Sequence, residues 1–120
     1  MLNAIESVVF FVNDIHDAAR WYAALFGLTA DDVQYENPNY AFIQAPGLLI
    51  GFHPADAKCP GGIGGTTSYW SVDDLEQVKT HLIANGATLH RGPGNTDLGA
   101  RVCMLIDPFG NTLGLHQAAK

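Results

Sequence analysis

Apolar positions along the chain follow two spacings, one typical of strands and one typical of helices. Residues 6–12 form a β-branched and aromatic run of strand length. Behind it, apolar residues recur every three or four positions through residues 15–26, which predicts an amphipathic helix. Asn13 or Asp14 can cap the start of this helix, and Gly27 can end it. The chain therefore begins with a predicted strand and a helix that buries one stripe.

Three shorter strand-like segments follow the predicted helix. Residues 33–36 carry a weak strand pattern, whereas residues 40–45 and 48–53 are apolar runs separated by Pro46-Gly47, a hairpin signal. Residues 54–65 then lose all periodicity and are rich in Gly and Pro, which predicts a loop or connector. The first half of the chain thus predicts the element order βαβββ.

The same order returns in the second half. Residues 66–72 predict a strand, and the following helix has an apolar stripe made of Leu75, Val78, Leu82 and Ile83. Asp73 and Glu76 have the spacing of a capping box at the start of this helix. Asn85-Gly86 is expected to end it.

The last segments predict a short strand and a hairpin. Residues 87–91 read as the short strand, and Gly92-Pro93-Gly94-Asn95 as the turn after it. The apolar runs at 102–106 and 113–115 flank Asp107-Pro108-Phe109-Gly110-Asn111. Because the ring of Pro108 restricts φ to a narrow negative range and Gly readily takes positive φ, these five residues predict a tight turn between antiparallel strands.

A half-chain repeat connects the two sets of elements. Val12-Asn13-Asp14-Ile15 matches Val72-Asp73-Asp74-Leu75, and the two motifs lie half the length of the chain apart. One βαβββ unit leaves one face of its sheet open, so two units can complete each other's burial. We therefore predict one α+β domain over 1–120, with a module at 1–54, a connector at 55–65 and a module at 66–120. Its eight strands should form a cupped sheet with the helices outside.

These motifs resemble the vicinal oxygen chelate superfamily, which includes glyoxalases, bleomycin- and fosfomycin-resistance proteins and extradiol dioxygenases. The resemblance rests on the two Val-x-Asp motifs, which lead to Trp21-Tyr22 and Phe26-Gly27 in the first half and to Gly86-Ala87 in the second, and on residues 107–111. It covers nearly the whole chain. The resemblance implies paired βαβββ modules, often dimeric, with a ligand site in the cup. It implies no single reaction, because one fold can host many activities.

The resemblance also implies where a metal ion would bind. Metal-dependent members typically carry a His on the first strand of each module and a Glu on the last strand. The corresponding positions here are Ser7, Thr67 and Gly114, and none of them offers a usual ligand for a divalent metal. We therefore expect no metal and no cofactor. A displaced site would have to use His53, His116 or Glu6, and Glu6 should point away from Ser7.

Strand alternation and the resemblance together give the candidate site residues. His53 and His116 are the candidates for a general base, because imidazole titrates near neutral pH. Arg101 can hold a carboxylate or phosphate, or can be a solvated residue at the end of a strand; Cys103 can be a nucleophile or a small apolar residue. The residues expected to line the ligand site are Ser7, Val9, Phe11, Tyr40, Phe42, His53, Thr67, Tyr69, Arg101, Cys103, Gly114 and His116.

Composition excludes several classes of partner. The net charge is −6 and the six Lys and Arg are scattered, so no footprint for a phosphate backbone is present and no nucleic-acid partner is expected. No apolar run approaches the roughly 18 residues that cross a bilayer, and the N-terminal residues lack a signal-peptide pattern. We expect a cytoplasmic protein with no membrane partner and with Cys59 and Cys103 as reduced thiols, although one disulfide stays possible.

The function predicted from the sequence is metal-independent binding of a small, largely apolar molecule in the cup. Such a protein is of the resistance or sequestration type, or has an unknown natural ligand, and is expected to be a homodimer. The alternative is an enzyme, either a glyoxalase-like lyase or isomerase with a displaced metal site, or a metal-free catalyst with a His base.

Overall fold

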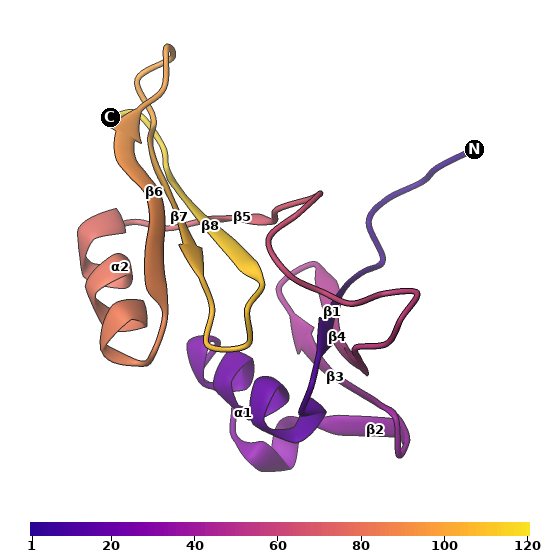
Figure 1. Cartoon of the computed structure of the whole chain (residues 1–120). Coiled ribbons are helices and arrows are strands. Elements are labelled where there is room, and N and C mark those ends of the chain that lie inside the picture. The colour runs from indigo at the N-terminus through magenta and orange to yellow at the C-terminus, as the bar shows by residue number, and fades with distance from the viewer. The chain divides into compact units, whose positions relative to one another are not determined.

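The computed structural model describes all 120 residues, which divide into two compact units. Unit 1 is Met1–Gly61 and unit 2 is Gly62–Lys120. Each unit contains one four-stranded mixed sheet and one α-helix (Figure 1). This confirms the α+β class and the repeated βαβββ order. Joining of the two sheets into one cupped eight-stranded sheet stays a prediction.

Unit 1 follows the predicted order with one addition. Its elements are β1 (Ser7–Val12), α1 (Ile15–Leu25), the 3-10 helix η1 (Ala30–Asp32), β2 (Gln34–Asn37), β3 (Tyr40–Ala45) and β4 (Leu48–Pro54). The strand order is β1-β4-β3-β2, with β1 parallel to β4 and the other pairs antiparallel. The short η1 was not predicted, because its residues have no apolar periodicity.

The core of unit 1 lies between α1 and one face of this sheet. The buried apolar side chains of β1, β3 and β4 are Phe10, Val12, Ala41, Ile43, Ala45, Ile50 and Phe52. Tyr22 of α1 stacks on Phe10 with ring centroids 4.7 Å apart. Because side chains alternate along a strand, the residues between these buried ones lie on the opposite side of the sheet. We call that side the open face of unit 1.

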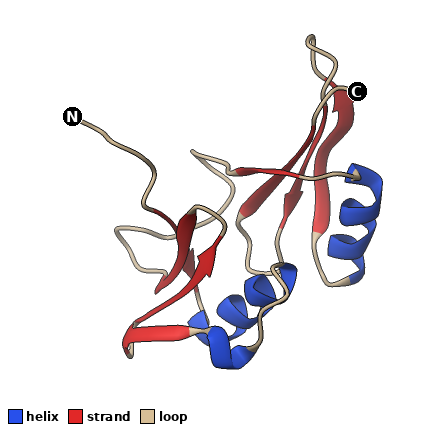
Figure 2. Ribbon diagram, turned by 180° about the vertical axis from the view of Figure 1, so that it is seen from behind, coloured by secondary structure: helices blue, strands red, loops and turns tan.

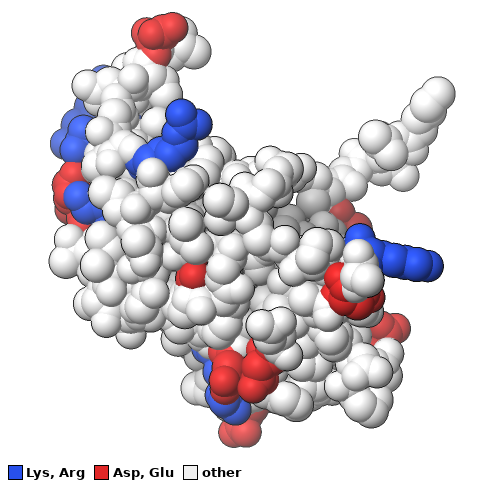
Figure 3. Space-filling model, in the orientation of Figure 1, with Lys and Arg blue, Asp and Glu red and all other residues white.

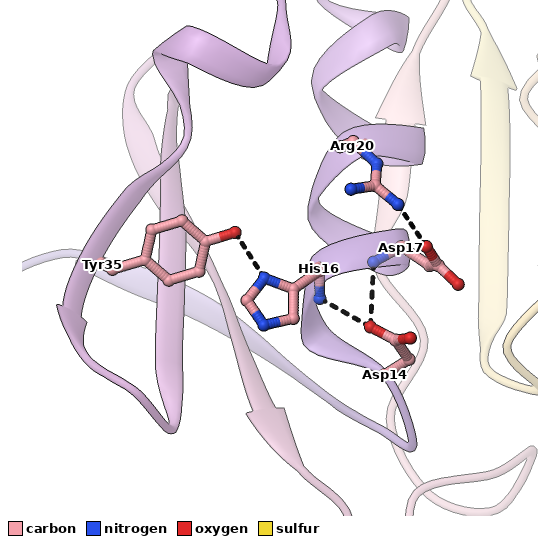
Figure 4. A network of polar contacts seen from close by, with 5 residues as sticks. All are labelled: Asp14, His16, Asp17, Arg20 and Tyr35. Atoms are coloured by element: carbon pink, nitrogen blue, oxygen red, sulfur yellow. Dashed lines mark hydrogen bonds and ion pairs between the residues drawn. The ribbon is translucent and has the colours of Figure 1, made fainter.

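A polar network fixes the start of α1 (Figure 4). Oδ1 of Asp14, the N-cap residue, accepts hydrogen bonds from the backbone N–H groups of His16 and Asp17 at 3.0 and 3.1 Å. The side chain of Asp17 pairs with that of Arg20. Nδ1 of His16 lies 2.8 Å from the hydroxyl of Tyr35, which links α1 to β2. Asp14 therefore satisfies backbone donors that the first turn of a helix leaves unpaired.

The Asp14 cap predicts a loss of stability in acid. The N–H of Asp17, followed by that of His16, holds the pKa of Asp14 below its usual value. A carboxylate with a depressed pKa in the folded state stabilises the fold above its unfolded pKa of about 4, and this stabilisation is lost as the pH falls through the folded pKa. The variant Asp14→Asn keeps the capping oxygen but does not titrate. Urea midpoints measured below about pH 4 should therefore fall more steeply for the wild type than for this variant.

Unit 2 repeats the arrangement. Its elements are β5 (Tyr69–Ser71), α2 (Leu75–Ala84), β6 (Thr88–Asn95), β7 (Arg101–Ile106) and β8 (Thr112–Gln117). The strand order is β5-β8-β7-β6, with β5 parallel to β8. Figure 2 shows α2 alongside this sheet, and Leu75 and Leu82 of α2 are fully buried together with Leu105 of β7.

Three details of unit 2 differ from the prediction. The strand predicted over 66–72 is confined to β5. The N-cap of α2 is Asp74, whose side chain accepts a hydrogen bond from the N–H of Gln77. The predicted capping pair of Asp73 and Glu76 therefore lies one residue too early in the chain. Residues 92–95 continue β6 with register shifts instead of forming a turn. The chain turns at residues 96–100, where the N–H of Thr96 donates to the carbonyl of Ala100.

One residue of the predicted stripe on α2 lies at the surface. Ile83 is 43% exposed, whereas Leu75 and Leu82 of the same helix are fully buried. Neither α1 nor α2 is long and apolar enough to span a bilayer.

The turn at residues 107–111 forms as predicted. Oδ1 of Asp107 accepts hydrogen bonds from the backbone N–H groups of Phe109 and Asn111, both at 2.9 Å. The side-chain oxygen of Asn111 in turn accepts from the N–H of Gly62 at 2.8 Å. Asp107 and Asn111 are both buried. The turn therefore carries a buried polar core that joins β7, β8 and the first residue of unit 2.

Candidate functional site

Four ring side chains share the open face of unit 1. They are Phe11 of β1, Tyr40 and Phe42 of β3, and His53 of β4. The rings of Phe11 and His53 meet edge to face with centroids 5.6 Å apart, and those of Tyr40 and Phe42 lie 6.2 Å apart at 30°. All four side chains are partly exposed. We call this group the aromatic face.

A glycine lies at the centre of the aromatic face. Gly51 of β4 is paired with Val9 on one side and with Phe42 on the other. A Cβ atom at this position would lie only 2.6 Å from Cζ and 3.0 Å from Cε1 of Tyr40. Since real Cβ atoms do not approach other atoms so closely, the phenol ring occupies the space that a side chain at residue 51 would need. Gly51 is therefore what allows Tyr40 to lie flat across the sheet.

His53 has a defined tautomer when it is neutral. Its Nδ1 lies 2.8 Å from the carbonyl oxygen of Pro54, and a carbonyl oxygen can only accept a hydrogen bond, so Nδ1 carries the proton. The Nε2 atom of the neutral ring then keeps its lone pair. His53 can therefore accept a hydrogen bond, or a proton, from a molecule on the aromatic face.

The corresponding face of unit 2 carries a second glycine covered by a tyrosine. Gly114 of β8 is paired with Tyr69 of β5, and a Cβ atom at Gly114 would lie 2.5–2.7 Å from atoms of the Tyr69 ring. On the same face, the hydroxyl groups of Thr67 and Thr112 are 2.7 Å apart and hydrogen-bonded. His116 lies two residues beyond Gly114, paired with Ser71.

The structure brings most candidate residues onto two faces, one in each unit. Those of unit 1 are Ser7, Val9, Phe11, Tyr40, Phe42 and His53, and those of unit 2 are Thr67, Tyr69, Gly114 and His116. Whether they contact a ligand stays a prediction.

Arg101 and Cys103 do not share the face of Gly114. Cys103 is 2% exposed on the side of β7 that packs against α2, and burial raises the pKa of its thiol, which disfavours the nucleophilic thiolate. Arg101 lies on the same side, and its guanidinium contacts Glu76 of α2 at 2.7 Å. Alternation along β7 places Val102 and Met104 on the other face instead, where Met104 is paired with Gly114.

The register relates the two faces position by position. Val9 is paired with Gly51 in unit 1, and Tyr69 is paired with Gly114 in unit 2. These two parallel pairs correspond, because Val9 and Tyr69 occupy the same position relative to the Val-x-Asp motif of their own unit. Each glycine begins a Gly-x-His segment, Gly51-Phe52-His53 and Gly114-Leu115-His116. His53 and His116 therefore occupy equivalent positions.

The family model of the Glyoxalase/Bleomycin resistance protein/Dioxygenase superfamily matches residues 4–115 of this chain. The chain belongs to this superfamily. The match covers both βαβββ units, which confirms the resemblance inferred from the motifs. A search of the curated proteins found no match.

Solved structures of the superfamily share the fold. A glyoxalase/bleomycin resistance protein/dioxygenase family enzyme from Burkholderia phytofirmans PsJN has a TM-score of 0.72 and 23% identity, over 95% of this chain and 98% of that chain. A glyoxalase/bleomycin resistance protein from Albidiferax ferrireducens T118 has a TM-score of 0.69 and 24% identity, with the same coverage. A lactoylglutathione lyase from Agrobacterium tumefaciens has a TM-score of 0.71 and 19% identity, over 98% of this chain and 96% of that chain.

The residues at the superfamily's metal positions do not fit a metal ion. The first-strand positions are Ser7 and Thr67, and the hydroxyl of Thr67 is hydrogen-bonded to Thr112. The last-strand position of unit 2 is Gly114, and the register makes Gly51 its counterpart in unit 1. Neither glycine has a donor atom in its side chain, and no group of three or more His, Cys, Asp or Glu lies close enough together to hold an ion.

Sequence reasoning did not identify Gly51 as a site residue. The available signal was the repeated Gly-x-His segment, whose two copies lie slightly farther apart than the two Val-x-Asp motifs do. The second module has a few more residues than the first between its first and last strands. A comparison of the two halves at the spacing of the Val-x-Asp motifs therefore does not align the two Gly-x-His segments.

Proposed function

We propose that this chain binds a small, largely apolar molecule on the aromatic face of unit 1, without a metal ion. The observation that carries the proposal is Tyr40 lying across Gly51, at the counterpart of a position where metal-dependent relatives carry a ligand residue. The rings of Phe11 and Phe42 extend the same surface. Aromatic side chains provide apolar contact area, and a few polar groups fix the orientation of a ligand.

Tyr40 and His53 supply those polar groups. Burial, followed by the negative charges of Glu6 and Glu36, raises the pKa of Tyr40, so its hydroxyl stays protonated at neutral pH and can donate a hydrogen bond. Nε2 of His53 can accept one. A bound molecule with one acceptor and one donor would use both.

A metal-free enzyme is the second candidate function. It is favoured by the hydrogen bond from His53 to Pro54, which fixes the imidazole and leaves Nε2 as a base. In this case turnover would be lost in a variant with Ala at both His53 and His116, whereas binding of an apolar molecule would persist. A lyase or isomerase that uses a displaced metal would instead lose activity in EDTA.

Native mass spectrometry of freshly purified protein tests the proposal directly, since it reports retained ligand, metal and subunit number together. We expect a homodimer from the cytoplasm that carries an organic ligand and no stoichiometric metal. A metal that binds the folded state raises the melting temperature, and EDTA removes that increase. Because we expect no bound metal, treatment with EDTA should leave the melting temperature of the protein unchanged. Stoichiometric Zn²⁺, Ni²⁺, Mn²⁺ or Fe, with a lower melting temperature in EDTA, would contradict metal independence.

A further inference from the structure

The acidic side chains of this protein are divided unequally between its two units. Unit 1 contains seven Asp and Glu against two Lys and Arg, a formal charge of −5, whereas unit 2 contains five against four, a formal charge of −1. Red acidic groups are correspondingly more plentiful than blue basic ones over the elements of unit 1 (Figure 3). The unit with the aromatic face therefore carries nearly all of the net charge.

Neither basic side chain of unit 1 belongs to its sheet. Arg20 lies on α1, where it pairs with Asp17, and Lys58 follows β4 in the connector. Strands β1, β2, β3 and β4 contain no Lys or Arg, and the one Asp or Glu among them is Glu36. An anionic ligand on the aromatic face would find neither a Lys nor an Arg on these strands.

The charged groups that act on the Tyr40 phenol are carboxylates. Gln34 of β2 is paired with Phe42, and Asn37 with Tyr40, so Glu36 lies beside Tyr40 where the register shifts. The carbonyl of Glu6 accepts from the N–H of Leu49, which fixes Glu6 just before β1 at the edge of the sheet. The raised pKa of Tyr40 reflects both carboxylates in addition to burial. Two negative charges therefore act on the phenol that covers Gly51.

The rings themselves also favour positive charge. The faces of Tyr40 and Phe42 carry the negative lobe of the aromatic quadrupole, and a cation above such a face is attracted to it. Nε2 of His53 adds a lone pair on the same surface. The carboxylates, the ring faces and the imidazole lone pair all favour a positively charged ligand.

We propose that the ligand of the aromatic face is a planar organic cation, a conjugated ring system that carries a delocalised positive charge. This inference rests on the proposed function and specifies the class of ligand. A flat ring can stack on Tyr40 and Phe42, while Glu36 beside Tyr40 offsets its charge.

Three probes of similar shape and different charge test the inference. They are N-methylquinolinium (a cation), methylnaphthalene (neutral) and naphthoate (an anion), with dissociation constants measured by calorimetry or equilibrium dialysis. We expect the cation to bind about 3- to 10-fold more tightly than the neutral probe and the anion to bind least. Added salt should weaken binding of the cation alone.

Charge variants show whether the carboxylate of Glu36 is responsible for the preference for the cation. Glu36→Gln should reduce affinity for N-methylquinolinium about threefold and leave affinity for methylnaphthalene unchanged. Asp97→Asn, which removes an exposed carboxylate of unit 2, is the matched control and should change neither value.

The outcomes separate this inference from the function on which it rests. Equal binding of the cationic and neutral probes, or tighter binding of naphthoate, would overturn the cationic ligand and keep the apolar site. Binding of none of the three probes would overturn the proposed function together with the inference.

Discussion

Replacement of Gly51 by Ala is expected to reduce affinity for methylnaphthalene at least about tenfold while leaving the fold intact. The new Cβ atom would lie 2.6 Å from Cζ of Tyr40, so the phenol ring must swing away from the sheet and leave its position beside Phe42. The displaced group is the end of a side chain, and Ala suits a strand better than Gly. The free energy of unfolding should therefore change by less than about 1 kcal/mol.

Two further variants make this result specific to the ring. Gly94→Ala adds the same methyl group to a strand glycine with no atom within 4 Å of the new Cβ, and its affinity should equal that of the wild type. Tyr40→Phe keeps the ring and removes the hydroxyl, and should retain most of the affinity for this purely apolar probe. If Gly51→Ala bound methylnaphthalene as the wild type does, Tyr40 would not be part of the binding surface.

Replacement of Asp107 by Ala is expected to lower the free energy of unfolding by about 2–4 kcal/mol. Asp107 is 3% exposed, and its carboxylate accepts from the N–H groups of Phe109 and Asn111. Without it, two backbone donors in a buried turn lose their partner, and each such loss costs about 1–3 kcal/mol. Urea unfolding followed by circular dichroism gives the value.

Asp56 provides a matched control for Asp107. Its Oδ1 also accepts from two backbone N–H groups, those of Lys58 and Cys59, at 2.9 and 2.8 Å, but it is exposed. Water can replace the lost oxygen there, so Asp56→Ala should cost less than about 1 kcal/mol. Equal losses in the two variants would show that burial of the turn contributes nothing.

The fold could be predicted well because its sequence signals are local. The Val-x-Asp motifs place a strand, a cap and a helix within a few residues, and Gly27 and Gly86 end the two helices at positive φ as expected. The errors have local causes too. The N-cap of α2 is the second of two adjacent Asp residues, and the Gly-Pro-Gly at residues 92–94 resembles a turn but continues an irregular edge strand.

The candidate site was less predictable because it depends on register. Alternation placed Val9 and Phe11 on the open face once the strand was recognised. It could not decide which side of β7 faces α2, and the structure places Arg101 and Cys103, two of the expected ligand-site residues, on that side. The position of the Tyr40 ring over Gly51 depends on a contact between two strands and a rotamer, neither of which a single sequence contains.

The two covered glycines are covered from different strands of their units. Tyr69 comes from the first strand of its unit, and its counterpart in the other unit is Val9; Tyr40 comes from the third strand, and its counterpart is Val102. A tyrosine that covers the glycine can therefore come from either of the two strands that flank the last strand of a unit, with the same steric result.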